Sequence, residues 1–422
     1  MKRIVIAILG SLGDLHPYMA LALGLRDRGC QPLIAAPALY QARVEAAGLA
    51  FTPLGSNLIL PDRERYKRIL NSRQGVEHLF RDLLMPTVPE IYRELRAILE
   101  AARPDLLVGH PIVFAAPLLS EQLGIPWVST VLAPMSFFSA HEPPAVPGTP
   151  GSLARGPRFL NPWWGKALRT AADLHTRRWV KPLAEFRRSC GLPPLKDNPL
   201  LDGQHSPSLV LAMFSKVLGE PQPDWPAQTR QTGFCFYDGD QAASKALDPA
   251  LARFLDAGPP PVVFTLGSTA VNAAGRFYED SAAAVHSLGL RALLLTGGHP
   301  ENIPAKLPPG VSAFPYAPYA ALFRRAAAVV HSGGVGTTAQ VLRAGVPSLV
   351  VPFNFDQPDN AYRMARLEVA RVIPRSVYNR FRAAVRIEEI LGRKSFSERA
   401  QSIATALAAE DGVAAACDAI NS

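Results

Sequence analysis

A chain of 422 residues is too long for one ordinary hydrophobic core, so its length favours two globular domains. Apolar residues make up 48% and charged residues 19% of the sequence, a balance that is typical of packed proteins and excludes a disordered chain. The formal net charge of +9 suits a nucleic acid, an anionic membrane face or a phosphate-bearing ligand. Because no dense block of lysines and arginines is present, we do not expect a nucleic-acid partner.

The sequence contains four cysteines, Cys30, Cys190, Cys235 and Cys417. They lie far apart without a CxxC pair, which argues against a disulfide framework and against a zinc ribbon, and favours a reducing compartment. The apolar run at residues 4–9 leads directly into a Gly/Asp turn, so we interpret it as a buried strand and not as a signal peptide. His110, Pro111 and Pro117 interrupt the best candidate for the roughly 18 apolar residues of a membrane helix. We expect a cytoplasmic protein, with at most weak peripheral contact at the inner membrane face.

Strand and helix patterns alternate in the first half of the chain. The strand at residues 4–9 is followed by a glycine-rich loop and by a helix that Pro17 is expected to open and Gly29 to end. The same order recurs in strands at residues 32–36, 105–108, 126–130 and 209–214, with helices at 40–47 and 114–123. Two irregular stretches, residues 53–89 and 133–207, are either loops that shape a binding cleft or plain surface segments.

A second strand and helix series follows a proline-rich connector at residues 219–240. Its strands are expected at residues 261–266, 291–296, 311–314, 327–331 and 347–351, and its helices at 277–288, 335–344 and 359–367. Residues 386–416 are alanine-rich and helical, and could cross back to the first half. We therefore expect an α/β protein with domains at 1–220 and 246–400, a linker at 221–245 and a terminal helix at 401–422. Two doubly wound, Rossmann-like domains would face each other across a cleft.

Ligands in such folds collect beyond the carboxyl ends of the strands, so the loops there carry the chemistry. The segment His331 to Thr338, HSGGVGTT, ends a strand and starts a helix, where free N–H groups and the helix dipole bind anions. By itself this pattern is more often a plain glycine-rich helix start. The next loop, PFNFDQPDN, contains Asp356 and Gln357, whose carboxylate and amide suit sugar hydroxyls.

These segments, with Phe264 to Ser268, FTLGS, and the opening GSLGDLHP at residues 10–17, resemble family 1 glycosyltransferases over nearly the whole chain. The Thr-Gly-Phe at residue 232 and the Pro-Asp-Trp at residue 223 most resemble the bacterial rhamnosyltransferases of rhamnolipid synthesis. Sterol, antibiotic and flavonoid glycosyltransferases come next. The resemblance implies the two-domain GT-B fold, with an acceptor-binding first domain and a nucleotide-sugar-binding second domain.

The resemblance also implies a donor site. The expected donor-binding residues are Gly13, Ser268, Thr269, Tyr316, Ala317, His331, Ser332, Gly333, Gly334, Val335, Gly336, Thr337, Asp356 and Gln357. The loop at His331 would bind the donor diphosphate, and Asp356 with Gln357 the donor sugar. Tyr316 stands where many relatives carry a tryptophan that stacks on the base, which leaves uracil and thymine open.

Two residues are candidates for the catalytic base. Relatives carry a histidine or aspartate three residues before the first-helix proline, and this sequence has Asp14 there. His16 is the alternative, with a more convenient intrinsic pKa, whereas Asp14 could instead only cap the helix. Asp238-Gly-Asp240 spells the DxD of metal-dependent relatives, but it lies in the connector, where we interpret it as a turn.

The sequence therefore predicts an inverting hexosyltransferase that needs no metal and no cofactor besides its nucleotide-sugar co-substrate. It would move rhamnose, glucose or a similar sugar from a dTDP or UDP donor to a hydroxyl of a hydrophobic acceptor, such as a hydroxy-fatty-acid lipid, flavonoid or sterol. A nucleotide-sugar epimerase or hydrolase and a non-catalytic nucleotide-sugar-binding protein are the alternatives on the same scaffold.

Overall fold

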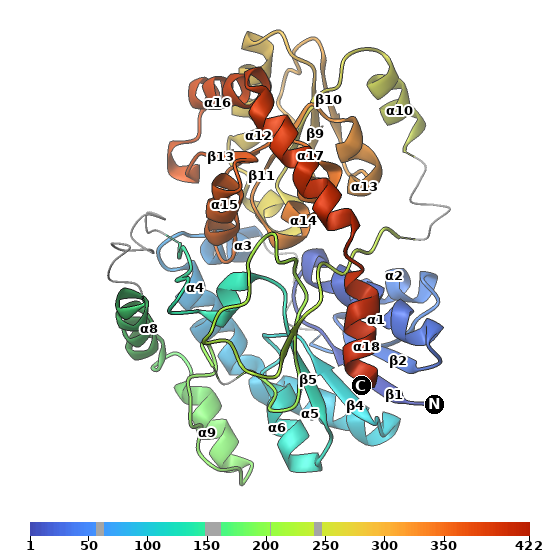
Figure 1. Ribbon diagram of the computed structural model, residues 1–422, viewed down its shortest axis with the longest axis vertical. Coiled ribbons are helices and arrows are strands. Elements are labelled where there is room, and N and C mark those ends of the chain that lie inside the picture. The colour runs from blue at the N-terminus through green and yellow to red at the C-terminus, as the bar shows by residue number, and fades with distance from the viewer. Residues whose placement is uncertain (56–62, 148–161, 203, 240–246) are drawn as a thin grey trace.

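The computed structural model describes residues 1–55, 63–147, 162–202, 204–239 and 247–422. Two α/β halves lie one above the other, with the N-terminal half below in Figure 1. The N-terminal sheet has seven strands in the order β3-β2-β1-β4-β5-β6-β7, and the C-terminal sheet has six in the order β10-β9-β8-β11-β12-β13. All the paired strands are parallel and helices cover both sheets, which confirms the expected α/β fold of two doubly wound halves.

The strands of the first sheet are β1 (Arg3–Ala7), β2 (Gln31–Ala36), β3 (Ala50–Pro53), β4 (Leu106–Gly109), β5 (Trp127–Val131), β6 (Val210–Ala212) and β7 (Thr229–Gln231). Those of the second are β8 (Val262–Thr265), β9 (Ala292–Leu295), β10 (Val311–Phe314), β11 (Ala328–His331), β12 (Ser348–Val350) and β13 (Ala370–Val372). The central strands are continuous apolar runs because helices bury both of their faces.

The helices of the first half are α1 (Leu12–Asp27), α2 (Gln41–Ala46), α3 (Arg63–Ile69), α4 (Gly75–Glu77), α5 (Met85–Ala102), α6 (Ala115–Leu123), α8 (Trp163–Thr176) and α9 (Lys181–Ser189). The second half contains α10 (Pro249–Asp256), α11 (Gly267–Ala270), α12 (Phe277–Ser287), α13 (Tyr319–Leu322), α14 (Val335–Ala344), α15 (Gln357–Arg366), α16 (Arg380–Gly392) and α17 (Lys394–Ala408). The last helix, α18 (Gly412–Asn421), lies against the first half.

The first helix starts earlier than its sequence predicts. It begins at Leu12 with Ser11 as its N-cap, and Pro17 lies inside it. The Ser11 hydroxyl accepts the Gly13 N–H, and the Asp14 carboxylate accepts the Ser11 N–H. This reciprocal cap starts the helix five residues before the proline. The expectation that Pro17 opens α1 is therefore wrong, because the cap decides the start and the proline costs only one hydrogen bond further in.

The two stretches expected to be irregular contain regular structure. Helices α3, α4 and the start of α5 lie in the first, and α8 and α9 in the second; residues 56–62, 148–161 and 203 lie outside the described part. Within the expected linker, residues 229–231 form β7, the edge strand beside β6, so the first sheet extends past residue 220. Short and half-exposed strands such as β7 bury little apolar surface and leave a weak sequence pattern.

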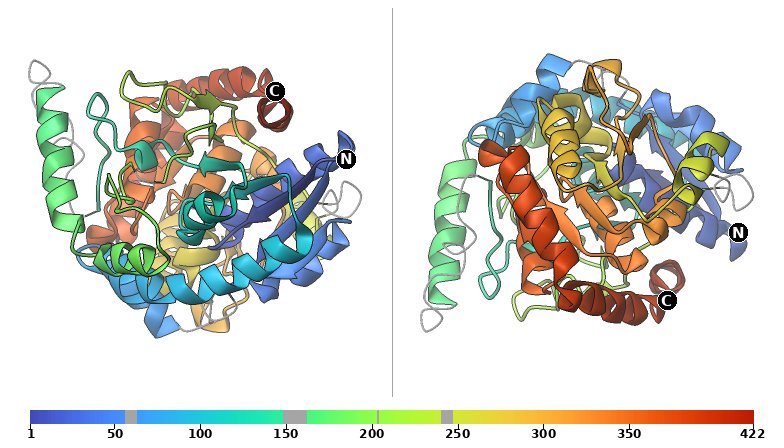
Figure 2. Two further views of the ribbon diagram at one scale, coloured as in Figure 1. Left: turned by 90° about the horizontal axis from the view of Figure 1, so that it is seen from below. Right: turned by 90° about the horizontal axis from the view of Figure 1, so that it is seen from above.

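The C-terminal helices join the two halves. Figure 1 shows α17 descending over the second half and α18 continuing beside α1 of the first, and the two views of Figure 2 agree on this crossing. Cys417 and Ile420 of α18 are buried in the cluster that surrounds α1 and β1. Among the described residues, no helix combines the length and apolar character that a membrane crossing requires.

Candidate active site

Strand register brings the loops of each half together at one edge of its sheet. In the first sheet Ala7 of β1 pairs with Gly109 of β4, so the loop before Asp14 adjoins His110. In the second sheet His331 of β11 pairs with Thr265 of β8 and with Val350 of β12. The segments that follow β8, β11 and β12 contain Ser268, Ser332 and Asp356, respectively. The carboxyl ends of both sheets thus supply neighbouring polar groups, as doubly wound folds do.

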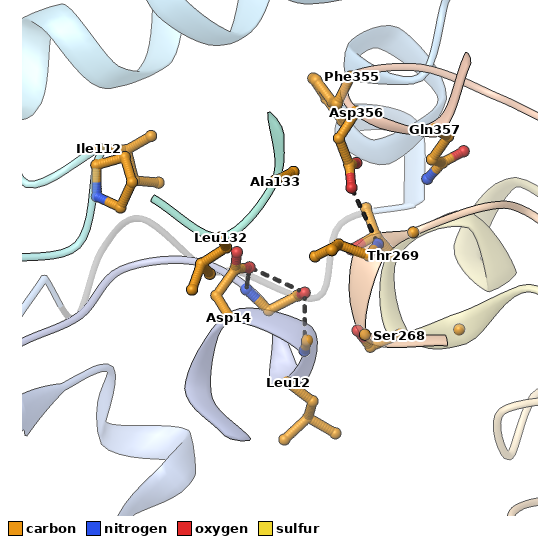
Figure 3. A pocket seen from close by; sticks show the side chains of 18 of the residues that line it. Leu12, Asp14, Ile112, Leu132, Ala133, Ser268, Thr269, Phe355, Asp356 and Gln357 are labelled. Atoms are coloured by element: carbon orange, nitrogen blue, oxygen red, sulfur yellow. Dashed lines mark hydrogen bonds between the residues drawn. The ribbon is translucent and has the colours of Figure 1, made fainter. Parts of the chain in front are cut away.

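A cavity of about 2200 Å³ lies between the halves and is lined by loops of both. Its volume is more than twice the roughly 300–1,000 Å³ of a pocket for one small ligand, so it has room for two ligands. Figure 3 shows Asp14, with Leu132 and Ile112 of the first half, across the cavity from Asp356 and Thr269 of the second. The halves meet closely at its floor, where a Cβ on Gly336 of α14 would lie 3.8 Å from the Cα of Gly13.

Asp14 is held at the start of α1 with one third of its side chain exposed. Its Oδ2 accepts from the Ser11 N–H at 2.7 Å and from the Ser11 hydroxyl at 3.1 Å. Gly10 makes room for this carboxylate, since its φ is +119° and a Cβ there would lie 2.4 Å from Oδ2. Asp14 therefore is part of the helix cap and also lines the cavity.

His110 is a neighbour of Asp14 that the sequence analysis missed. Its Nε2 lies 3.2 Å from Asp14 Oδ1, and its Nδ1 accepts the Ile112 N–H at 3.3 Å. An Nδ1 that accepts places the proton of a neutral ring on Nε2, so His110 donates to Asp14. Burial raises the pKa of the Asp14 carboxyl, but the hydrogen bond from His110, the electrostatic attraction of its N–H, and the bonds from Ser11 outweigh it and hold this pKa below its usual value. A polar residue directly after a buried strand next to β1 was the signal that could have revealed it.

His16, the alternative base, also lines the cavity. Burial, with a smaller contribution from the charge of Arg43, lowers the pKa of His16 to about 4, so its ring is neutral at pH 7. Its Nε2 is buried and has no hydrogen-bond partner among the described residues, and its ring lies 5.4 Å from that of Tyr237. A neutral imidazole can accept a proton, so geometry alone leaves both candidates in the cavity.

The HSGGVGTT segment forms the helix start that its sequence predicts. Gly334 is the N-cap of α14, and the first turn of a helix leaves its N–H groups without intrahelical acceptors. Asp356 accepts from the N–H of Val335 at 3.0 Å, whereas Gly336 and Thr337 follow in that turn and line the cavity. An anion at this point would meet these N–H groups and the positive end of the helix dipole.

His331 lies behind this helix start and is fully buried. Its Nδ1 accepts the Gly333 N–H at 3.1 Å, so a neutral ring carries its proton on Nε2, and burial lowers the pKa of this histidine to about 3. The Nε2 donor has no acceptor among the described residues. Three of the expected donor-binding residues, His331, Gly333 and Ala317, do not contribute to the cavity lining.

Asp356 and Gln357 stand at the start of α15. Burial raises the pKa of Asp356 to about 7, against the hydrogen bonds from Val335 and Asn360, and the nearby charge of Asp14 raises it further. Gln357 Oε1 accepts from the N–H groups of Phe353 and Asn354, at 2.8 and 3.3 Å, which leaves its amide nitrogen as the donating end. Phe355 just before them has a φ of +59°, a strained conformation for a residue with a side chain.

The other expected donor-binding residues line the cavity. Ser268 and Thr269 of α11 face the cavity, as do Gly13, Ser332, Gly334 and Val335. The Ser332 hydroxyl donates to the Leu266 carbonyl at 3.1 Å. Tyr316 is 58% exposed at the rim, with its ring 6.5 Å from that of Tyr319, and offers an open aromatic face.

The DxD sequence of the connector is only partly described, because Asp240 lies outside the described residues. Asp238 Oδ1 pairs with Arg343 Nη1 of α14 at 2.7 Å, and the Arg343 guanidinium stacks over Phe236 at 4.4 Å. Asp238 therefore ties the connector to the second half, and it also lines the cavity.

Comparison with known proteins matches both halves of the chain to family models. Residues 4–134 match the glycosyltransferase family 28 N-terminal domain, and residues 293–418 match the C-terminal domain of erythromycin biosynthesis protein CIII-like proteins. The chain is 35% identical over 426 residues to the O-mycaminosyltylonolide 6-deoxyallosyltransferase of Streptomyces fradiae, covering 98% of this chain and 96% of that one. The chain belongs to the GT-B glycosyltransferases.

Further similarities to this glycosyltransferase support the same assignment. The vancomycin aglycone glucosyltransferase of Amycolatopsis orientalis is 29% identical over 374 residues, 87% of this chain and 84% of that one. Two solved structures share the fold: the glycotransferase of kitacinnamycin, with a TM-score of 0.73, 22% identity and coverage of 100% and 98%, and spinosyn rhamnosyltransferase SpnG complexed with thymidine diphosphate, with a TM-score of 0.68, 21% identity and full coverage of both chains. The expected enzyme class is thereby confirmed.

Proposed function

We propose that this glycosyltransferase moves a hexose or 6-deoxyhexose, such as glucose or rhamnose, from a dTDP or UDP donor to a hydroxyl of a hydrophobic small molecule. The transfer would invert the anomeric carbon and require no metal. The observation that carries the proposal is the cavity in which Asp14 of the first half faces the α14 helix start and Asp356 of the second. A single displacement needs a base for the acceptor hydroxyl and an anion site for the departing diphosphate, and these two groups face each other across the cavity.

In the proposed step the acceptor oxygen attacks the anomeric carbon and forms the new glycosidic bond as its proton passes to Asp14. The bond between the anomeric carbon and the diphosphate oxygen breaks, and its electron pair leaves with the nucleoside diphosphate. The N–H groups of Gly336 and Thr337 and the α14 dipole stabilise the charge that grows on this leaving group. These N–H groups and the helix dipole would thus take the place of a metal ion, and turnover undiminished by EDTA is the expected result.

The donor sugar would meet Asp356 and the amide nitrogen of Gln357, and the base would stack on Tyr316. The relative at 35% identity is named a 6-deoxyallosyltransferase, which supports a deoxyhexose as the transferred sugar. The N-terminal part of the cavity is lined by Phe80, Leu83, Phe114, Leu132, Met135 and Trp164, among others. Such a wall supports an apolar acceptor, with hydroxy-fatty-acid lipids, flavonoids and sterol-like molecules as the classes to test.

The test is to replace Asp14 and His16 in parallel. Asp14→Asn keeps the cap geometry but removes the base, and we expect a loss of about 10²–10⁴-fold in turnover with donor binding preserved. His16→Gln should retain most of the activity. Turnover is measured by product analysis with dTDP-rhamnose and UDP-glucose against the three acceptor classes, and donor binding by calorimetry.

Undiminished turnover in Asp14→Asn together with its loss in His16→Gln would assign the base to His16. Sugar-nucleotide consumption that needs no acceptor would overturn transfer in favour of an epimerase or hydrolase. Nucleotide-sugar binding without any product from the wild-type protein would leave only a binding function.

A further inference from the structure

The loop at residues 352–357 carries Asp356 and Gln357. It is hydrogen-bonded to residues 69–71 of the N-terminal half, which belong to the stretch at residues 53–89. Asn354 is fully buried, and its Nδ2 donates to the carbonyls of Ile69 at 2.7 Å and Asn71 at 3.0 Å. Ile69 also packs in the hydrophobic cluster of the second half, together with Phe353. Figure 1 shows α3 directly beneath that half.

The stretch at residues 133–207 makes a second set of contacts, with helix α15. Arg363 of α15 is 3% exposed; its Nε donates to Asp359 at 2.6 Å and its Nη1 to Glu142 of the first half at 2.7 Å. Asp359 is 1% exposed, and its other oxygen accepts the Ala145 N–H at 3.0 Å. Arg366 pairs with Glu142 as well.

These contacts are indirect with respect to any ligand. Asn354, Asp359, Arg363 and Glu142 do not line the cavity, but their neighbours Ile69, Pro143, Pro144 and Val146 do. The first of these segments therefore faces the cavity on one side and holds the loop of Asp356 on the other, whereas the second faces the cavity and holds α15, the helix that follows this loop. A buried ion pair adds little net stability because desolvation offsets its attraction, yet it strongly penalises any geometry that separates the charges.

We propose that the two N-terminal stretches form a clamp on the donor-sugar loop, with Asn354, Arg363 and Glu142 as positioning residues that set where Asp356 and Gln357 stand. This proposal rests on the proposed function of that loop. Its consequence is that recognition of the sugar, unlike recognition of the nucleotide, depends on contacts supplied by the acceptor half.

The test compares how tightly each protein binds two ligands. Calorimetry measures two dissociation constants for the wild type and for the variants Glu142→Gln and Asn354→Ala. The first ligand is the nucleoside diphosphate alone, dTDP or UDP. The second is the sugar nucleotide with the same base that the wild type binds most tightly. We expect each variant to weaken sugar-nucleotide binding about tenfold while nucleoside diphosphate binding stays within about twofold, a coupling of ordinary size. Thermal unfolding establishes that each variant is folded.

The matched control is Glu389→Gln on α16. Glu389 pairs with Arg371 and Arg386 at 2.9 and 2.6 Å, but it lies away from the cleft. Its loss should move neither affinity. Equal weakening of both ligands in the clamp variants, or no weakening of either, would overturn the clamp and leave the proposed function standing. A wild-type protein that binds neither dTDP nor UDP would instead overturn the proposed function.

Discussion

Among the groups that lower the pKa of Asp14, His110 has the largest influence. Its ring is buried, and its tautomer is dictated by the Ile112 N–H, so its one N–H is directed at the carboxylate. A carboxylate held in this way stays ionised at neutral pH and keeps one orientation, as the proposed base requires. Asp356 is in the opposite situation, because burial outweighs its hydrogen bonds and raises its pKa to about 7. Two carboxylates in one cavity thus have different environments and are suited to different tasks.

Replacing His110 tests this arrangement by the pH dependence of turnover. An asparagine can still accept the Ile112 N–H but cannot reach Asp14, whereas a glutamine places its amide nitrogen near the position of Nε2. The lost hydrogen bond in His110→Asn raises the pKa of Asp14, so the acid limb of the pH–rate profile should move to higher pH, and kcat should fall on the order of tenfold. His110→Gln should stay closer to the wild type. An unmoved acid limb in His110→Asn would mean that Asp14 is not the group that titrates.

At the scale of elements, β11 and α14 together form the helix start that we propose as the anion site. Gly333 has a φ of +89°, and a Cβ there would lie 2.8 Å from Val350 Cγ1 and 3.0 Å from the Gln357 carbonyl. Gly334, the N-cap, has a φ of −57° and open space around it. The adjacent glycines therefore serve different purposes: the first lets β11 turn sharply beneath α15, and the second lets a ligand approach the backbone.

An alanine at each position should separate these purposes. Gly333→Ala should cost roughly 1–3 kcal/mol of stability through the strained backbone and the contact with β12. Gly334→Ala should unfold like the wild type in urea but bind nucleoside diphosphate more weakly, since its methyl group projects into the cavity. If Gly334→Ala bound dTDP and UDP with unchanged affinity, the ligand would not approach the backbone at this point.

At the scale of the whole molecule, the two halves are joined by more than the connector. One hydrophobic cluster contains Phe137 and Val210 of the first half together with Val263 and Leu342 of the second. Helix α18 returns to the first half, where Lys2 Nζ donates to the Ile420 carbonyl at 2.8 Å and Ile420 is 5% exposed. The end of the chain therefore completes the core around its beginning.

Truncating Ile420 measures what this return contributes. Ile420→Ala should destabilise the first half by about 2–5 kcal/mol, because it removes buried methyl groups and leaves a cavity beside α1. Val385→Ala on α16 is the control, since Val385 is 59% exposed and its truncation should change stability by no more than about 0.5 kcal/mol. Urea unfolding monitored by tryptophan fluorescence gives both values, and equal effects would contradict a structural role for α18.

The sequence alone determined the alternation of strands and helices, the fold class and the motifs at the strand ends, because hydrophobic periodicity and glycine patterns are local signals. It predicted α14 at residues 335–344 and β10 at residues 311–314 with the bounds that the structure has. It placed the start of α1 wrongly, since a reciprocal cap at Ser11 competes with the proline signal.

Only the tertiary structure decided which distant residues meet. Asp14 and His110 are brought together by the pairing of β1 with β4, and Asn354 meets Ile69 because two halves close on each other. The interpretation of residues 53–89 and 133–207 likewise changed, because both stretches hold the loop of Asp356 and the helix after it as well as line the cavity. Such contacts leave no periodic pattern in a single sequence, since they depend on how sheets, helices and halves pack and not on the residues next to them in the chain.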